Sequence, residues 1–282
     1  SGQTGELYFK APSLSLSTTS EFYLYYGNAT NTDYAASDTY GSENVWTNNF
    51  LGVYHFEESA SGVGTSDVYQ DATANNYDGD DFVAATGKSG FMGAGQEFDN
   101  SNTDYIRLPH TLLDGETDVT ASVWFRSNND TIHALISGAN SGEGNEYLWW
   151  LRGDQDEVEY FSHGSSREEY DIIDIYDNTW RHLTMVREDS TNFARFYLNG
   201  GEDNQSPQAD TVYALDFDSG VLIIGQDQDS VGGGFDGGQE LDGYIDELRF
   251  AGTIRDSGWI ANVYSNQSTP TSFYSVGSIE TE

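Results

Sequence analysis

Near its C-terminal end the chain reads Asp242-Gly243-Tyr244-Ile245-Asp246-Glu247-Leu248-Arg249-Phe250, and this segment is the most informative about the fold. In this stretch Tyr244, Leu248 and Phe250 alternate with polar residues, a pattern that predicts a β-strand with one buried face. Asp246 and Glu247 place two carboxylates inside the same strand. Because burial of an ionised group is costly, we expect both carboxylates to be paired or bound to a metal ion.

A short helix is predicted directly after this strand. Asp256 or Ser257 is suited to cap it, and apolar residues follow at helical spacing, beginning with Trp259 and Ile260. The strand and the helix together resemble the C-terminal signature of laminin-G-like domains, which belong to the concanavalin A-like lectin/glucanase superfamily.

Other segments resemble the same family and occur in the family's order. They are residues 51–58, 71–79, 90–100, 104–109, 119–126, 180–186 and 195–200. Most are short, alternate between apolar and polar residues, and are separated by Gly, Asn and Asp turns, as in an antiparallel sandwich.

The predicted fold is therefore all-β: a concanavalin A-like jelly-roll β-sandwich with a short C-terminal helix, spanning residues 49–282. Closure of two curved sheets is expected to bury six large side chains between them. These are Trp124, Phe125, Leu183, Met185, Phe196 and Leu198.

Residues 1–48 are predicted to be a separate unit. Residues 7–10 and 22–26 are strand-like, and a polar segment rich in Gly, Ser, Asn and Thr follows them. The second strand resembles the end of a β domain that often precedes laminin-G-like domains in archaeal and bacterial surface proteins. We therefore expect the terminal strands of a preceding β domain, followed by a linker.

The chain is strongly acidic, with 47 Asp and Glu residues against 11 Lys and Arg, a net charge of −36. Self-repulsion of this size is relieved by salt, which favours a halophilic origin over the alternative of a surface tuned for solubility or for calcium. No basic patch is visible for nucleic acid, and no apolar run is long enough for membrane insertion. The expected location is extracellular, at a cell surface or at a virion surface. Because the chain has no cysteine, stability there would not depend on disulfides.

The resemblance implies a structural calcium ion, Ca2+, held by carboxylate and carbonyl oxygens. Asp246 is the first expected ligand, beside oxygens of the opening strand that include Glu57. Asp99 and Asp71 follow by resemblance of their turns. In the alternative, Asp246 accepts hydrogen bonds from loop amides only, and Glu247 pairs with an arginine such as Arg249 or Arg107.

A glycan-binding face is predicted from two neighbouring aromatic strands, residues 147–152 and 160–163. Sugars stack on aromatic rings and offer hydroxyls to polar side chains. Because strand neighbours point to opposite faces, only one of Trp149 and Trp150 can lie in the core. The expected ligand-binding residues are Tyr147, Trp149, Trp150, Arg152, Tyr160, His163 and Tyr170. In the alternative, the outward tryptophan covers a loop or a neighbouring domain.

These features predict a non-catalytic recognition or adhesion module that binds glycan or glycoprotein. The competing hypothesis is a structural spacer or assembly domain of a surface layer, a filament or a virus tail fibre, whose aromatic faces contact other subunits. A minor alternative is a glycoside hydrolase, because residues 169–174 have the outline of a glucanase Glu-x-Asp-x-x-Glu strand. Asp174 stands there in place of the acid/base Glu, which weakens that hypothesis.

Overall fold

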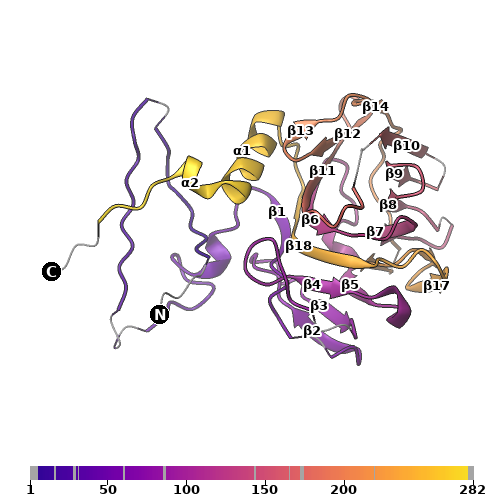
Figure 1. The fold of residues 1–282 in the computed structure, drawn as a ribbon, viewed down its shortest axis with the longest axis horizontal. Helices are drawn as coiled ribbons and strands as arrows, with labels where there is room; N and C mark the ends of the chain where they lie inside the picture. Colours follow the sequence, from indigo (N-terminus) through magenta and orange to yellow (C-terminus); the bar gives the residue numbers. More distant parts are fainter. Residues whose placement is uncertain are drawn as a thin grey trace.

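The computed structural model describes residues 6–15, 17–27, 30, 32–59, 61–84, 87–142, 144–164, 166–171, 175–218 and 220–278. Two antiparallel sheets dominate these residues and pack face to face, with a small hairpin beside them (Figure 1). The predicted jelly-roll-like sandwich with a short C-terminal helix is confirmed. No described helix is both long and apolar enough to span a membrane.

We call the first sheet sheet A. Its strand order is β1 (Phe50–Tyr54), β18 (Gly243–Ala251), β6 (Val119–Arg126), β11 (Arg181–Glu188), β12 (Phe193–Leu198) and β13 (Gly201–Glu202), with β4 (Gln96–Phe98) pairing to β18 and β14 (Gln208–Ala209) pairing to β12. The first and last long strands of the chain, β1 and β18, are therefore neighbours.

The second sheet, sheet B, comes from the middle of the chain. Its strand order is β10 (Ser166–Asp171), β9 (Glu157–Ser162), β8 (Tyr147–Arg152), β7 (Ile132–Gly138), β15 (Val221–Ile224), β5 (Tyr105–Pro109), β3 (Gly79–Phe82) and β2 (Thr65–Tyr69). The separate hairpin pairs β16 (Gln228–Ser230) with β17 (Gly233–Phe235). Short 3-10 turns occupy η1 (Ser42–Asn44), η2 (Asn100–Asn102) and η3 (His110–Leu112).

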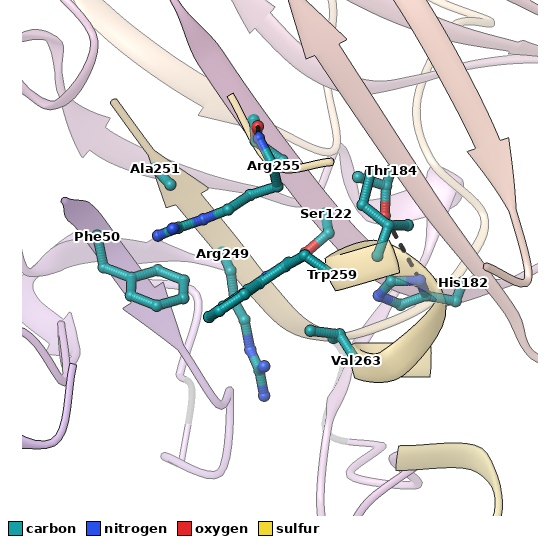
Figure 2. Close-up of a pocket in the computed structure, with 11 residues that line it drawn as sticks. Phe50, Ser122, His182, Thr184, Arg249, Ala251, Arg255, Trp259 and Val263 are labelled. Carbon is teal, nitrogen blue, oxygen red and sulfur yellow. Dashed lines mark hydrogen bonds between the residues drawn. The ribbon is translucent and has the colours of Figure 1, made fainter. Parts of the chain in front are cut away.

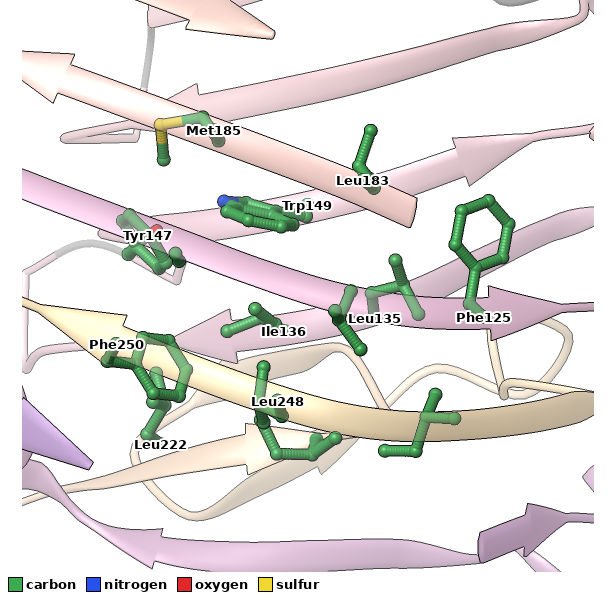
Figure 3. Packing of buried hydrophobic residues seen from close by; sticks show 14 of the residues in the cluster. Phe125, Leu135, Ile136, Tyr147, Trp149, Leu183, Met185, Leu222, Leu248 and Phe250 are labelled. Atoms are coloured by element: carbon green, nitrogen blue, oxygen red, sulfur yellow. The ribbon is translucent and has the colours of Figure 1, made fainter. Parts of the chain in front are cut away.

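The core lies between the two sheets (Figure 3). Four of the six expected core residues, Phe125, Leu183, Met185 and Phe196, are buried there, and Leu198 packs against the cluster half-buried. Trp124 is also buried, but on the outer face of sheet A, where its ring stacks on Phe91 at 3.5 Å between centroids. The prediction for Trp124 was wrong because alternation along β6 gives the core face to Val123 and Phe125.

A β-bulge in β18 changes which of its side chains point into the core, so the predicted alternation was wrong in part. The register between β18 and β6 shifts between Asp246 and Arg249, and Glu247 takes a left-handed φ of 53°. The extra residue changes the phase of the alternation, so Ile245 and Leu248 both reach the core. Tyr244 lies half-buried outside it, although the sequence pattern predicted a buried residue.

The helix α1 (Ser257–Ser268) covers part of the outer face of sheet A, followed by α2 (Pro270–Phe273). Asp256 is the N-cap residue, and its carboxylate accepts a hydrogen bond from Trp259 N at 2.7 Å. Ile260 of the helix packs with Val186 and Tyr197 of the sheet. The predicted cap and helix are therefore present.

The first segment of the chain lies outside the sandwich (Figure 1). Residues 7–10 and 22–26 are extended, and neither belongs to a strand of the described part of the structure. Tyr8 joins this segment to the sandwich, because its ring stacks on His55 at 4.6 Å and its hydroxyl donates to Glu247 Oε1 at 2.7 Å. The expected preceding β domain stays a prediction.

Candidate functional site

The predicted aromatic face is divided between the two sides of sheet B. Tyr147, Trp149 and Tyr160 are buried in the core, whereas Trp150 is half-buried on the outer side. The expectation that only one tryptophan is a core residue agrees with this arrangement. The Trp150 ring contacts Phe161 edge-on at 4.9 Å, and its Nε1 donates to Asp227 Oδ2 at 3.2 Å.

The polar members of the predicted face are occupied by protein partners. Arg152 pairs with Asp154 at 3.0 Å and with Glu159 at 2.7 Å. His163 is bound between Glu146 and Arg187, at 3.0 Å from each. Tyr170 belongs to β10, and its side chain lies outside the described residues. Of the seven predicted residues, Trp150 and Arg152 remain together on the outer side of sheet B.

The four carboxylates predicted to bind calcium do not form one cluster. Both carboxylate oxygens of Asp71 accept hydrogen bonds from the backbone of β1 and of its own turn. The donors are the amides of Val53, Thr73 and Tyr77, at 2.9–3.1 Å. Asp99 caps η2 through the Ser101 amide. These two carboxylates act as acceptors for backbone donors, a role that carboxylates fill at caps and turns.

The other two predicted ligands lie along the loop of residues 87–95. Asp246 Oδ2 accepts hydrogen bonds from Phe91 N at 2.9 Å and Met92 N at 2.8 Å, while Glu57 is exposed near Gly93. Burial, and after it the charge of the neighbouring Glu247, raise the pKa of Asp246 to about 8 against the opposing effect of the two amides.

The described residues contain no group of three or more His, Cys, Asp and Glu side chains that could hold a metal ion. The local geometry matches the alternative for Asp246, with loop amides as donors, and Glu247 pairs with Arg249. These residues do not fit a shared calcium site, so calcium binding stays a prediction from resemblance.

The sequence did not predict a groove of about 280 Å³ in sheet A. This groove lies where β4, the end of β6 and the start of β18 meet. Its lining includes Glu97, Arg126, Asn128, Asn178 and Tyr244. The two asparagine side chains are exposed, and the other three side chains are half-buried.

Arg126 organises this groove. Its guanidinium Cζ lies 4.2 Å from the Tyr244 ring centroid and 5.2 Å from the Trp180 ring centroid. Its Nε has no hydrogen-bond partner among the described residues. The Tyr244 hydroxyl donates to Glu97 Oε1 at 2.5 Å, which fixes the ring at the groove wall. The register opposes Tyr244 to Arg126 across β18 and β6.

The groove offers a specific chemistry. Planar amides can both donate and accept hydrogen bonds, a guanidinium donates only, and the Tyr244 ring has an apolar face. These are the groups that a ligand rich in hydroxyls needs. Sequence spacing gave no signal for the groove, because its residues meet only through cross-strand register and loop folding.

Comparisons with known proteins agree with the fold. The sequence profile of the Concanavalin A-like lectin/glucanases superfamily matches residues 100–261. The C-reactive protein 3.3 of Limulus polyphemus is 28% identical over 140 residues, 49% of this chain and 57% of that protein. The Serum amyloid P-component of Sus scrofa is 27% identical over 175 residues, 60% of this chain and 74% of that protein. The match therefore spans little more than half the length of the first relative.

Two solved structures share the fold at low sequence identity. The binding domain of Paraclostridial Mosquitocidal Protein 1 superposes with a TM-score of 0.55 and 14% identity, over 77% of this chain and 52% of that chain. The ligand binding domain of Botulinum neurotoxin serotype D, solved in complex with N-acetylneuraminic acid, superposes with a TM-score of 0.53. Its sequence identity is 13%, over 78% of this chain and 51% of that chain. Since the matched profile covers more than half of the chain, the protein belongs to the Concanavalin A-like lectin/glucanases superfamily.

Proposed function

We propose that this protein is a non-catalytic, extracellular recognition module that binds glycan or glycoprotein in the groove beside Arg126. The observation that carries the proposal is the combination of exposed amides, an arginine and an aromatic ring around about 280 Å³ of open space. That volume is near the lower limit for ligand pockets, about 300 Å³, and suits one or two sugar units.

The groove fits a sugar in two ways. The apolar C–H face of a pyranose can stack on Tyr244, and its hydroxyls can reach the amides of Asn128 and Asn178. Sialic acid bound to a neurotoxin domain of the same fold is consistent with this use of the fold, although fold alone does not determine function.

The net charge of −36 supports our further proposal that the protein works at a cell or virion surface in molar salt. Screening at that salt concentration would remove most of the repulsion between exposed carboxylates. The proposal excludes nucleic acid as a partner, because a surface of this charge repels phosphates.

The test is a glycan array in molar salt, probed with the native protein and with N128A/N178A. We expect saturable binding by the native protein and its loss in the double variant. Asn266→Ala is the control, because Asn266 is also an exposed asparagine and lies on α1, away from the groove. Loss of binding in Trp150→Ala with retention in N128A/N178A would refute the groove and locate the ligand on the outer face of sheet B.

A second function, assembly with other subunits, is favoured by the first segment of the chain. Its extended residues expose apolar side chains, including Phe9, Tyr23, Leu24 and Tyr25, of which Tyr25 is 84% exposed. Such patches mark contact surfaces. Light scattering in molar salt tests this proposal: a dimer or larger assembly that dissociates in L24S/Y25S would support it, and a monomer at every concentration would refute it.

A further inference from the structure

A cavity of about 30 Å³ lies on the outer face of sheet A, beneath α1 and at the opposite end of β6 from the groove (Figure 2). Its walls include Phe50, Ser122, Arg249, Arg255 and Trp259. Trp259 is 41% exposed and forms the outer wall. The space is about the size of one or two water molecules.

Arg255 is the main cationic group of this cavity. The residue is 8% exposed, and its Cζ lies 4.5 Å from the Trp259 ring and 5.1 Å from the Phe50 ring. Its Nη2 donates to the carbonyl oxygen of Asn48 at 2.5 Å. Its Nε has no hydrogen-bond partner, and no carboxylate of the described residues forms an ion pair with it.

Arg249 contributes a second guanidinium from the adjacent strand. It is 9% exposed, pairs with Glu247 and lies over the Trp46 ring at 4.8 Å. Its Nε also has no partner among the described residues. Glu247 therefore balances one of the two charges, and the cavity keeps a local positive charge in a chain whose net charge is −36.

The remaining polar wall does not supply an anion. His182 is buried, and burial and then Arg249 lower its pKa to about 3, so the ring is neutral at pH 7. Its Nδ1 lies 3.5 Å from the Thr184 hydroxyl. Neither a hydroxyl nor a neutral ring neutralises a guanidinium, and buried donors of this kind normally have acceptors.

We propose that this cavity binds one small anion, a halide ion or a single carboxylate group, through Arg249 and Arg255. A charge-assisted hydrogen bond to either Nε–H would satisfy donors that the protein itself leaves without acceptors. The size of the cavity excludes larger groups. The ligand can be chloride from the surrounding salt or the carboxylate of an acidic sugar, and the site does not depend on the groove beside Arg126.

Crystals of the native protein soaked in bromide test the site directly. We expect an anomalous bromide peak within hydrogen-bond distance of an Arg255 nitrogen. Water alone at that position, under conditions in which bromide occupies other surface sites, would overturn the proposal. Repeating the soak with added N-acetylneuraminic acid distinguishes the sources: displacement of bromide identifies a carboxylate ligand, and retained bromide identifies a free halide.

A measurement in solution uses unfolding midpoints at fixed sodium concentration. Replacing chloride by methanesulfonate, which is too large for the cavity, is expected to lower the midpoint of the native protein by about 2 °C or more. Arg255→Gln should lose this response. Arg107→Gln is the matched control, because it removes the same charge from a more exposed ion pair with Asp80 on sheet B.

Arg255→Lys keeps the charge but removes the Nε–H, and it is also expected to respond less than the native protein. Equal anion responses in the native protein, Arg255→Gln and Arg107→Gln would show that chloride acts by general screening, and would overturn the proposal. The bromide soak needs no variant, so the proposal stays testable if Arg255→Gln does not fold.

Discussion

The indole Nε1 of Trp150 donates a hydrogen bond to Oδ2 of Asp227 at 3.2 Å, although 77 residues separate them in sequence. Asp227 is 1% exposed, and Ser137 Oγ lies 3.4 Å from its other carboxylate oxygen. Burial, and after it the charge of Asp229, raise the pKa of Asp227 to about 6 against the opposing effect of these two hydrogen bonds. The contact holds the loop after β15 against the outer face of sheet B.

Asp227 should therefore make stability depend on pH. Between about pH 4 and pH 6 the folded protein keeps a proton on Asp227 that the unfolded chain has lost, so this residue lowers the free energy of unfolding as pH rises. Asp227→Asn keeps an acceptor for Trp150 and cannot ionise. Relative to the native protein, the variant should gain about 2 kcal/mol between pH 4 and pH 6 in denaturant titrations. Asp218→Asn, at an exposed carboxylate whose pKa is lowered, should show no such gain.

Truncation of Trp149 and truncation of Trp150 should lower the free energy of unfolding by clearly different amounts. Trp149 is fully buried, with its ring 5.6 Å from that of Phe196. Trp149→Ala should cost about 3–5 kcal/mol in urea unfolding through the cavity that it leaves. Trp150→Ala loses one hydrogen bond and an edge contact on a half-buried face, and should cost about 1–2 kcal/mol. Similar costs for both would contradict their placement on opposite faces.

The strands were largely predictable from local pattern. The predicted segment 119–126 coincides with β6, and the segment 147–152 coincides with β8, because alternation and flanking turns are properties of contiguous residues. The outward Tyr244 was not predictable, since the bulge at Glu247 follows from how β18 fits β6 rather than from either strand alone.

The candidate sites were harder to predict than the strands. The groove needs Arg126, Asn178 and Tyr244 to meet across a register that no spacing encodes. Similarly, Arg255 meets Arg249 at the cavity through the turn after β18, which the hydrogen bond from Arg255 N to Thr120 Oγ1 joins to β6. Aromatic residues drew attention to residues 147–163, but such rings fill a sandwich core as readily as they bind sugar.

Asp71 should be essential to the fold with or without calcium. Its carboxylate satisfies three backbone amides and the Thr73 hydroxyl. Asp71→Ala should cost about 3 kcal/mol, because buried amides lose charged acceptors. Asp99→Ala removes one exposed cap and should cost about 1 kcal/mol. The costs should be the same in calcium and in chelator; a cost for Asp71→Ala that appears only with calcium would instead identify Asp71 as a metal ligand.

Substitution of Glu247 should destabilise the fold strongly, because this carboxylate is 1% exposed and interacts with three side chains. It accepts from Tyr8 at 2.7 Å, lies 2.6 Å from His55 Nδ1 and pairs with Arg249. Glu247→Gln keeps the shape but leaves Arg249 buried without its counter-charge, so it should cost about 3 kcal/mol in urea unfolding. It should also release the first segment to protease, since Tyr8 loses a charged acceptor. Glu188→Gln breaks a half-buried, solvent-accessible pair with Arg195 and should cost less than about 1 kcal/mol. Equal losses in the two variants would mean that Glu247 behaves as a surface charge, and that packing alone holds the first segment against the sandwich.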